Sequence, residues 1–212
     1  MRDISDAILS AKAFRVNEGT VLVHRRIKTP MYCDCRVLFS NPSQRTIVIE
    51  ALLRAIRPTL QKRRRPAIAG IAVAGVPWAA MIADRLNLPL LVVRPERKKY
   101  GTRRLVEGDA AIGSHVVIID DVLFSGTALL EAMSALRAEH LLPTTVATIV
   151  SYGNTKLSRA LSRKRIQAVP LLRAEQLVAD ALRAGQISPA QAAVCNTFMQ
   201  KLASRPLPSP FR

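Results

Sequence analysis

The stretch from Val116 to Leu130 constrains the fold of this chain more than any other. Four consecutive β-branched apolar residues, 116–119, are typical of a strand buried on both faces, as in a parallel sheet. Two carboxylates, Asp120 and Asp121, follow directly. A buried pair of like charges is unstable unless it meets solvent, a cation or the hydroxyl groups of a ligand. The segment therefore predicts a strand whose carboxyl end opens on a binding site.

A small turn, Ser125-Gly126-Thr127, leads from this strand into a predicted helix over residues 128–137. Free backbone N–H groups and the positive end of the helix dipole make such a turn a cradle for a phosphate group. Taken singly, these residues are explained as polar groups at a strand end and a helix N-cap. The contiguous order of strand, acid pair, small turn and helix instead favours a site for a sugar phosphate.

The rest of the chain alternates between strands and helices, as a parallel α/β sheet requires. The predicted strands are 67–73, 90–93, 116–119, 145–151 and 166–170, and the predicted helices are 3–14, 41–56, 78–86, 128–137, 155–161, 174–184 and 189–204. Two further strands, 20–24 and 31–36, form an early hairpin outside the alternating pattern. We expect this hairpin to act as a hood over the carboxyl edge of the sheet, where ligands bind in open α/β folds.

Length and composition indicate a single cytoplasmic domain. A chain of 212 residues can bury a sizeable core. We divide it into a hood hairpin at about 15–40, an α/β core at about 41–172 and C-terminal helices with a tail at 173–212. No apolar run reaches the length of a membrane span, and residues 1–14 lack the layout of a signal peptide. Cys33 and Cys35 fall on one face of a predicted strand, and we expect them to be buried thiols.

The net charge of +17 has two explanations. Basic clusters at 25–28, 62–65, 94–104 and 163–165 would suit a nucleic-acid surface, which attracts phosphates electrostatically. Aromatic residues make up only 4% of the chain, so stacking on bases has little support. The favoured explanation is an Arg-rich composition together with a substrate that carries several phosphates.

A long polar connection, Arg94–Gly108, lies between two predicted parallel strands. Loops of this length in α/β proteins are often lids. It carries six cations and stands directly before the sugar-phosphate strand. Either the connection is a charged surface loop that contacts only solvent, or its cations neutralise the charge of a departing pyrophosphate.

These segments together resemble the orotate phosphoribosyltransferase family of type I phosphoribosyltransferases. The stretch 116–130 resembles the family's motif for 5-phosphoribosyl-1-pyrophosphate (PRPP), and 94–108 is similar to its mobile catalytic loop. The segment 29–36, Thr-Pro-Met-Tyr-Cys-Asp-Cys-Arg, resembles the family's early Ser-Pro-x-Tyr-x-Asp-x-Arg segment. The segment 70–77, Gly-Ile-Ala-Val-Ala-Gly-Val-Pro, is similar to its pyrophosphate-side loop. The resemblance covers residues 15–155 in order.

The resemblance implies a homodimeric enzyme that uses PRPP with Mg²⁺ and transfers 5-phosphoribose to orotate or a related heterocyclic base. The resemblance implies that Asp120 and Asp121 bind the two ribose hydroxyls and stabilise the positive charge that develops at C1. It also implies that Lys98 and Arg94 stabilise the leaving pyrophosphate. The catalytic residues are then Lys98, Asp120 and Asp121. The PRPP-binding set is Arg94, Lys98, Tyr100, Asp120, Asp121, Ser125, Gly126, Thr127 and Ala128. Mg²⁺ is expected to bind through PRPP, with no direct protein ligand.

The chain departs from the family in the residues that meet the base. Ser151-Tyr152 stands where the family has Asp-Arg, whose Arg meets the base carboxylate. In the PRPP motif, Phe124 stands where a small hydroxyl residue is usual, which leaves its backbone N–H as the donor to phosphate. A replacement cation from the hairpin would be Lys28, the first choice, or Arg26 or Arg25. Alternatively, these cations only keep a surface turn hydrated. The acceptor would then be a neutral base whose ring packs against Tyr152 or Phe124. A rival function is a non-catalytic PRPP sensor that binds nucleic acid.

Overall fold

A six-stranded sheet runs through the computed structural model, which describes residues 2–23, 27–61, 63–95 and 104–207. Its strand order is β5-β4-β3-β6-β7-β8. The strands are β3 (Pro66–Ile71), β4 (Leu90–Val93), β5 (Val106–Glu107), β6 (His115–Leu123), β7 (Leu142–Ser151) and β8 (Gln167–Arg173). All neighbours pair in parallel except β4 and β5. The predicted parallel α/β sheet is confirmed, and the short strand β5 lies within the segment predicted as a lid loop.

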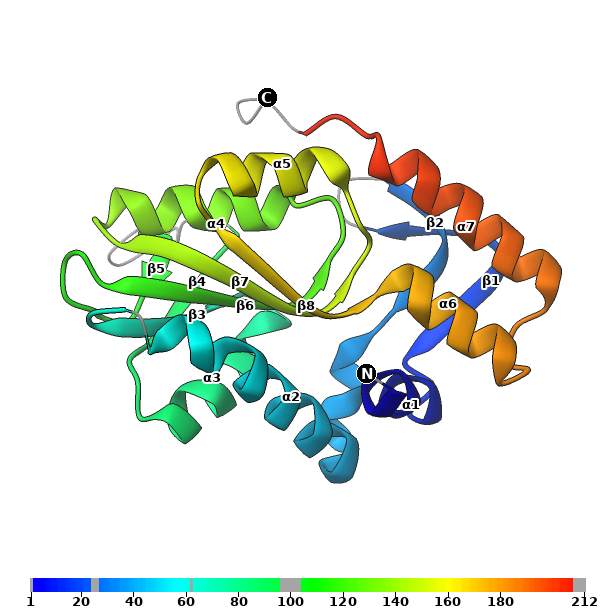
Figure 1. Cartoon of the computed structure of the whole chain (residues 1–212), viewed down its shortest axis with the longest axis horizontal. Coiled ribbons are helices and arrows are strands. Elements are labelled where there is room, and N and C mark those ends of the chain that lie inside the picture. The colour runs from blue at the N-terminus through cyan, green and yellow to red at the C-terminus, as the bar shows by residue number, and fades with distance from the viewer. Residues whose placement is uncertain (1, 24–26, 62, 96–103, 208–212) are drawn as a thin grey trace.

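Helices cover both faces of this sheet (Figure 1). One face packs against α2 (Pro42–Leu60) and α3 (Gly75–Leu86), and the other against α4 (Thr127–Ala138) and α5 (Thr155–Arg163). The central strand β6 contributes to both cores, because Val117 and Ile119 belong to one buried cluster while Val116 and Ile118 belong to the other. Burial on both sides explains the unbroken apolar run that marks this strand in the sequence.

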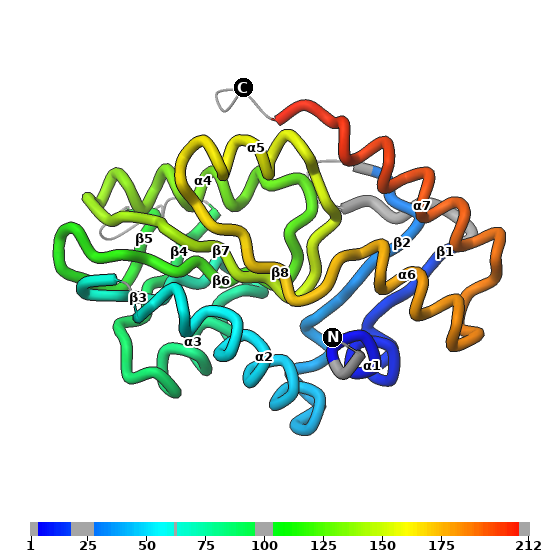
Figure 2. Tube along the Cα trace, in the orientation of Figure 1, coloured from blue at the N-terminus to red at the C-terminus, as the bar shows by residue number. Residues whose placement is uncertain are grey.

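The N-terminal and C-terminal segments come together beyond the carboxyl ends of the strands, on the right of Figures 1 and 2. They comprise α1 (Arg2–Ser10), β1 (Phe14–Val23), β2 (Ile27–Cys33), the 3₁₀ helix η2 (Cys35–Ser40), α6 (Ala174–Arg183) and α7 (Pro189–Ala203). The strands β1 and β2 pair as an antiparallel hairpin, as predicted. Within the described parts of the chain, none of the helices combines the length and apolar character needed to cross a bilayer.

Three element boundaries differ from the sequence prediction for identifiable reasons. The second hairpin strand ends at Cys33 because Asp34 caps η2, its carboxylate accepting a bond of 3.2 Å from the Arg36 backbone N–H. Strand β6 continues through the acid pair because Asp120 and Val122 still pair with β7. Helix α3 begins at Gly75, three residues before the predicted start at residue 78. A Cβ at Gly75 would lie 2.5 Å from the carbonyl oxygen of Ile119, so only glycine allows this close approach.

Candidate active site

A pocket of about 230 Å³ lies at the carboxyl edge of the sheet, between β6 and the hairpin segment. The acid pair and the phosphate turn form one side of it, and residues of β2 and η2 form the other. Its lining comprises Met31, Tyr32, Cys33, Arg36, Ala74, Asp120, Asp121, Val122, Leu123, Phe124, Ser125, Gly126, Thr127, Ala128, Leu129 and Tyr152. Six members of the predicted PRPP-binding set, from Asp120 to Ala128, therefore meet in one cavity.

The carboxylates of the acid pair accept hydrogen bonds from neighbouring backbone N–H groups. A carboxylate oxygen of Asp120 accepts a bond of 3.0 Å from the Asp121 N–H, and Asp121 accepts one of 2.8 Å from the Val122 N–H. Burial, reinforced by the charge of Asp121, raises the pKa of Asp120 well above its usual range, and burial also raises the pKa of Asp121. Two crowded carboxylates of this kind favour a ligand that brings a cation or several hydroxyl groups.

The turn after β6 is shaped for close backbone contact with an anion. Gly126 has a φ of +80°, and a Cβ at this position would lie 2.4 Å from a methyl group of Leu157 on α5. Glycine is therefore required both for the conformation and for the packing. The hydroxyls of Ser125 and Thr127 lie 3.2 Å apart at the N-terminus of α4. The predicted arrangement of a small hydroxyl-bearing turn at a helix N-terminus is present.

The opposite wall carries a network of three polar side chains. Arg36 donates from Nε and Nη2 to the two carboxylate oxygens of Asp34, at 2.6 and 3.0 Å, and from Nη2 to the Tyr32 hydroxyl at 2.9 Å. The bond from Arg36 is the main reason that the pKa of Asp34 is lowered. Among the described residues that line the pocket, Arg36 is the one cationic side chain.

Phe124 and Tyr152 place aromatic rings in the pocket between these walls. The ring centroids of Phe124 and Tyr152 are 4.9 Å apart, and Phe198 of α7 lies 6.1 Å from Phe124 in a stacked arrangement. Tyr152 is almost fully buried, and burial raises its pKa well above the usual value. Phe124 and Tyr152, two residues that depart from the family's pattern, thus contribute aromatic surface to this pocket together with Tyr32.

The remaining predicted site residues fall in three places. Arg94 follows β4 and forms an ion pair of 3.1 Å with Glu107 of β5. Lys98, Tyr100 and Arg26 lie outside the described residues. Lys28 is exposed and does not line the main pocket. It borders a second depression with Phe198, Lys201, Leu202, Ser204, Arg205 and Pro206.

Arg36 was not among the predicted base-binding residues. Its signal in the sequence was the Asp-x-Arg spacing at 34–36, which permits a bidentate pair across one intervening residue. The sequence predicts a strand through residue 36. The chain instead turns into η2 after Asp34, and the Arg36 side chain lines the pocket beside Tyr32.

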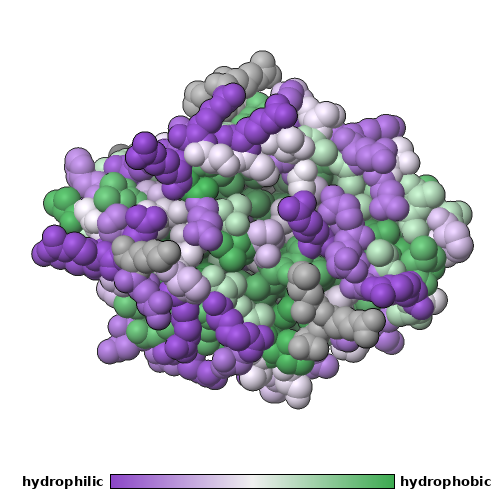
Figure 3. Space-filling model, viewed as in Figure 1, coloured by the Kyte–Doolittle hydropathy of each residue, from purple (hydrophilic) through white to green (hydrophobic). Residues whose placement is uncertain are grey.

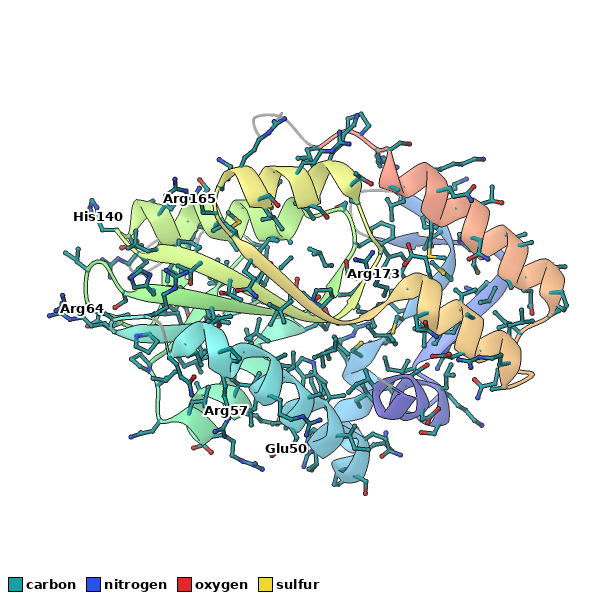
Figure 4. The ribbon with its side chains drawn as sticks, viewed as in Figure 1. Glu50, Arg57, Arg64, His140, Arg165 and Arg173 are labelled. Atoms are coloured by element: carbon teal, nitrogen blue, oxygen red, sulfur yellow. The ribbon has the colours of Figure 1, made fainter. Side chains whose placement is uncertain are left out.

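The basic clusters of the chain are divided between the two edges of the sheet. Arg94 stands at the carboxyl edge, whereas 63–65 and 163–165 come just before β3 and β8, at the amino edge. Figure 4 shows Arg64, His140 and Arg165 toward the end of the molecule away from the hairpin, and Figure 3 shows hydrophilic side chains spread around this view. Within the described residues none of the cations at 63–65 and 163–165 forms an ion pair. None of these cations lines the pocket.

The fold and the pocket define the chain as a phosphoribosyltransferase. Residues 41–168 match the family model described as Phosphoribosyl transferase domain. This range includes the acid pair, the phosphate turn and the loop after β4. The solved structure of UMP synthase from Leishmania donovani has the same fold, with a TM-score of 0.78 at 23% identity, and the chain spans 42% of that protein's length.

More similar relatives narrow the assignment. The orotate phosphoribosyltransferase of Bacillus caldolyticus is 35% identical over 162 residues, which cover 76% of this chain and 77% of that protein. The crystal structure of orotate phosphoribosyltransferase from Aeropyrum pernix superposes with a TM-score of 0.70 at 25% identity, covering 84% of this chain and 98% of the other. The chain belongs to the orotate phosphoribosyltransferase family. This membership favours the pentosyltransferase over a non-catalytic sensor.

Proposed function

We propose that this protein transfers 5-phosphoribose from PRPP to orotate and releases pyrophosphate. The observation that carries the proposal is the single pocket in which Asp120, Asp121 and the Ser125–Ala128 turn face a wall of aromatic rings and one arginine. Carboxylates and a phosphate cradle suit the donor, and a flat aromatic wall with a cation suits a planar, negatively charged acceptor.

On the donor side, the carboxylates of Asp120 and Asp121 accept hydrogen bonds from the ribose diol, and the turn at 125–128 binds the 5′-phosphate through its N–H groups. As the bond from C1 to pyrophosphate breaks, positive charge develops on the ribose, and the nearby carboxylates stabilise it. Arg94 and Lys98 compensate the charge of the leaving pyrophosphate, and Tyr100 belongs to the same loop. Arg94 is held by Glu107 in the free protein and would exchange this partner on substrate binding.

The residues of the pocket fit a Mg²⁺ ion that binds together with PRPP. Within the described residues, no group of three or more His, Cys, Asp or Glu side chains could hold a metal ion. Mg²⁺ in phosphate-binding sites commonly takes most of its ligands from water and the substrate, with one or two carboxylates nearby. Asp120 and Asp121, whose pKa values are raised by burial, are the groups whose charge such a cation would balance. When bound, the ion supplies charge neutralisation for the departing pyrophosphate.

On the acceptor side, the ring of orotate packs against Phe124, which Tyr152 supports from behind, and its carboxylate needs a cation or several donors. Two sources are available. Arg36 lines the pocket, although Asp34 already engages it. Lys28, followed by Arg26, is the hairpin candidate, and Lys28 does not line the pocket in the free protein, so it would have to move to reach the acceptor.

The family resemblance also supports a cytoplasmic homodimer in which the loop after β4 completes the site of the neighbouring subunit. A loop of this kind can close over the substrates and exclude water. Analytical ultracentrifugation of the purified chain tests the dimer directly. A single monomeric species at assay concentration would reject the shared site.

A pyrophosphate-release assay with PRPP, Mg²⁺ and a panel of bases tests the proposed function. Orotate should give turnover, and adenine, hypoxanthine and uracil should give much less. Release with one of the other bases in place of orotate would move the assignment to another acceptor. Failure to bind PRPP at all, measured by calorimetry, would reject the proposal.

A further inference from the structure

Cys33 and Cys35 form a buried thiol pair in the wall of the pocket. Their Sγ atoms lie 3.7 Å apart in hydrogen-bond contact, and both residues are free thiols. They are 4% and 0% exposed, respectively. Cys33 is a lining residue of the pocket, whereas Cys35 lies behind it. A small solute in the pocket therefore reaches the pair through Cys33.

We propose that this pair is a modification site at which a peroxide oxidises the two thiols to an intramolecular disulfide. The Cys33 sulfur attacks a peroxide oxygen, the O–O bond breaks, and a sulfenic acid and one water form. The Cys35 sulfur then attacks the Cys33 sulfur, and the hydroxyl group leaves as a second water after taking the thiol proton. Two electrons pass from the sulfurs to one molecule of peroxide.

The positions of the two thiols set the order of these steps. The thiolate is the reactive form of cysteine. The hydrogen bond with Cys33 and burial raise the pKa of Cys35 well above its usual value, and the charges of Asp121 and Asp34 add to this effect. Cys35 is also fully buried and does not line the pocket, so a free oxidant meets Cys33 first and Cys35 then acts on a Cys33 that is already oxidised. Its contact distance of 3.7 Å makes that second step local.

Formation of the bond would displace the residue between the two cysteines. The sulfur atoms must approach from 3.7 Å to about 2.05 Å. Asp34 is that residue, and its carboxylate holds Arg36, which in turn donates to Tyr32. The change is thus transmitted to two lining residues of the acceptor wall. The acid pair and the phosphate turn belong to β6 and α4 and are not part of this network.

Peptide mass spectrometry tests the modification without any need for turnover. The full chain is treated with hydrogen peroxide, quenched, blocked with iodoacetamide in denaturant and digested with trypsin. Cleavage after Lys28 and Arg36 releases residues 29–36, which hold both cysteines. This peptide should lose two hydrogen atoms in mass and escape alkylation. Cys35→Ser should abolish this product, and Cys195→Ser should retain it. Alkylation of both cysteines after treatment, or a disulfide between chains on a non-reducing gel, would overturn the proposal.

A second measurement tests the link to the pocket and rests on the proposed function. In the Cys195→Ser background, oxidation should raise the KM for orotate by about tenfold, the change expected when one charge-assisted hydrogen bond is lost. The KM for PRPP should stay constant, and dithiothreitol should restore the first value. An oxidised peptide with an unchanged orotate KM would overturn the coupling to the acceptor wall. Absence of turnover before oxidation would count against the proposed function alone.

Discussion

Phe124 lies edge-on against Tyr152, with 4.9 Å between the ring centroids and 74° between the ring planes. Edge-to-face contacts of this kind contribute about 0.5–1.5 kcal/mol beyond the area that they bury. Phe124 is partly exposed in the pocket, whereas Tyr152 is buried behind it. The outer ring is therefore positioned to contact an acceptor, and the inner ring holds it in place.

Phe124→Ala should weaken acceptor binding while leaving the donor unaffected. We expect the KM for orotate to rise about threefold to tenfold, because the lost aromatic contact is worth on the order of 1 kcal/mol. Tyr152→Phe keeps the supporting ring and serves as the matched control, with little change expected. Steady-state kinetics with each substrate varied in turn is the measurement. A change confined to the PRPP KM would contradict this role.

Asp120→Asn combined with Asp121→Asn should abolish tight binding of PRPP with Mg²⁺. Each charge-assisted hydrogen bond lost to the ribose diol should cost roughly 1.5–3 kcal/mol. Isothermal titration calorimetry measures the affinity, and circular dichroism confirms that the isosteric variant is folded. An unchanged affinity in the double variant would sink the assignment of these carboxylates.

The same double variant should be more stable than the parent at neutral pH in the absence of ligand. Burial raises the pKa of both carboxyl groups in the folded state. Their contribution to stability therefore falls as the pH rises from the unfolded value, about 3.9, through the raised folded value. Each kcal/mol removed should raise Tm by roughly 2–4 °C at pH 7, and the gain should vanish below about pH 4. Equal Tm values of the parent and the double variant at pH 7 would mean that burial of the two carboxylates does not destabilise the folded state.

Lys98→Ala should lower kcat far more than it changes PRPP affinity. Removing one preorganised charge-stabilising group typically costs about 10²–10³ in turnover. Mixing this variant with the subunit that lacks both Asp120 and Asp121 carboxylates should restore part of the activity, if the loop acts across a dimer. Verified heterodimers that remain inactive would remove the shared-site proposal. They would leave the role of Lys98 in chemistry to be judged from kcat alone.

The cation that meets the acceptor carboxylate should be revealed by single substitutions. Lys28→Ala, Arg26→Ala and Arg36→Gln are compared with orotate and with uracil, which lacks the carboxylate. Loss of the responsible cation should reduce kcat/KM for orotate about tenfold to hundredfold, the effect of one charged hydrogen bond, and leave uracil unaffected. Orotate preference that survives both hairpin substitutions would reject the hairpin cations and favour Arg36. Activity with uracil and not with orotate would reject orotate as the acceptor.

The donor half of the site could be predicted from sequence because its residues are consecutive. One strand, one turn and one helix start bring Asp120, Asp121 and Ser125–Ala128 together without any contribution from distant segments. The acceptor half depends on tertiary packing. Arg36 reaches the pocket because Asp34 ends a strand and caps a 3₁₀ helix, and alternation of apolar residues gives no sign of that change. Phe198 joins the aromatic group from α7, which is remote in sequence from Phe124.

The close backbone contact between Gly75 and Ile119 indicates how this fold can change its acceptor over evolutionary time. The frame that carries the donor site allows no added atom at that contact, since a Cβ would lie 2.5 Å from a backbone oxygen. Two polar residues of the acceptor wall, Tyr32 and Arg36, come from β2 and η2, which do not share this contact. Substitutions there can accumulate while the donor geometry is preserved. A lineage, or a directed-evolution library restricted to these segments, can therefore explore new bases without rebuilding the machinery that activates the ribose.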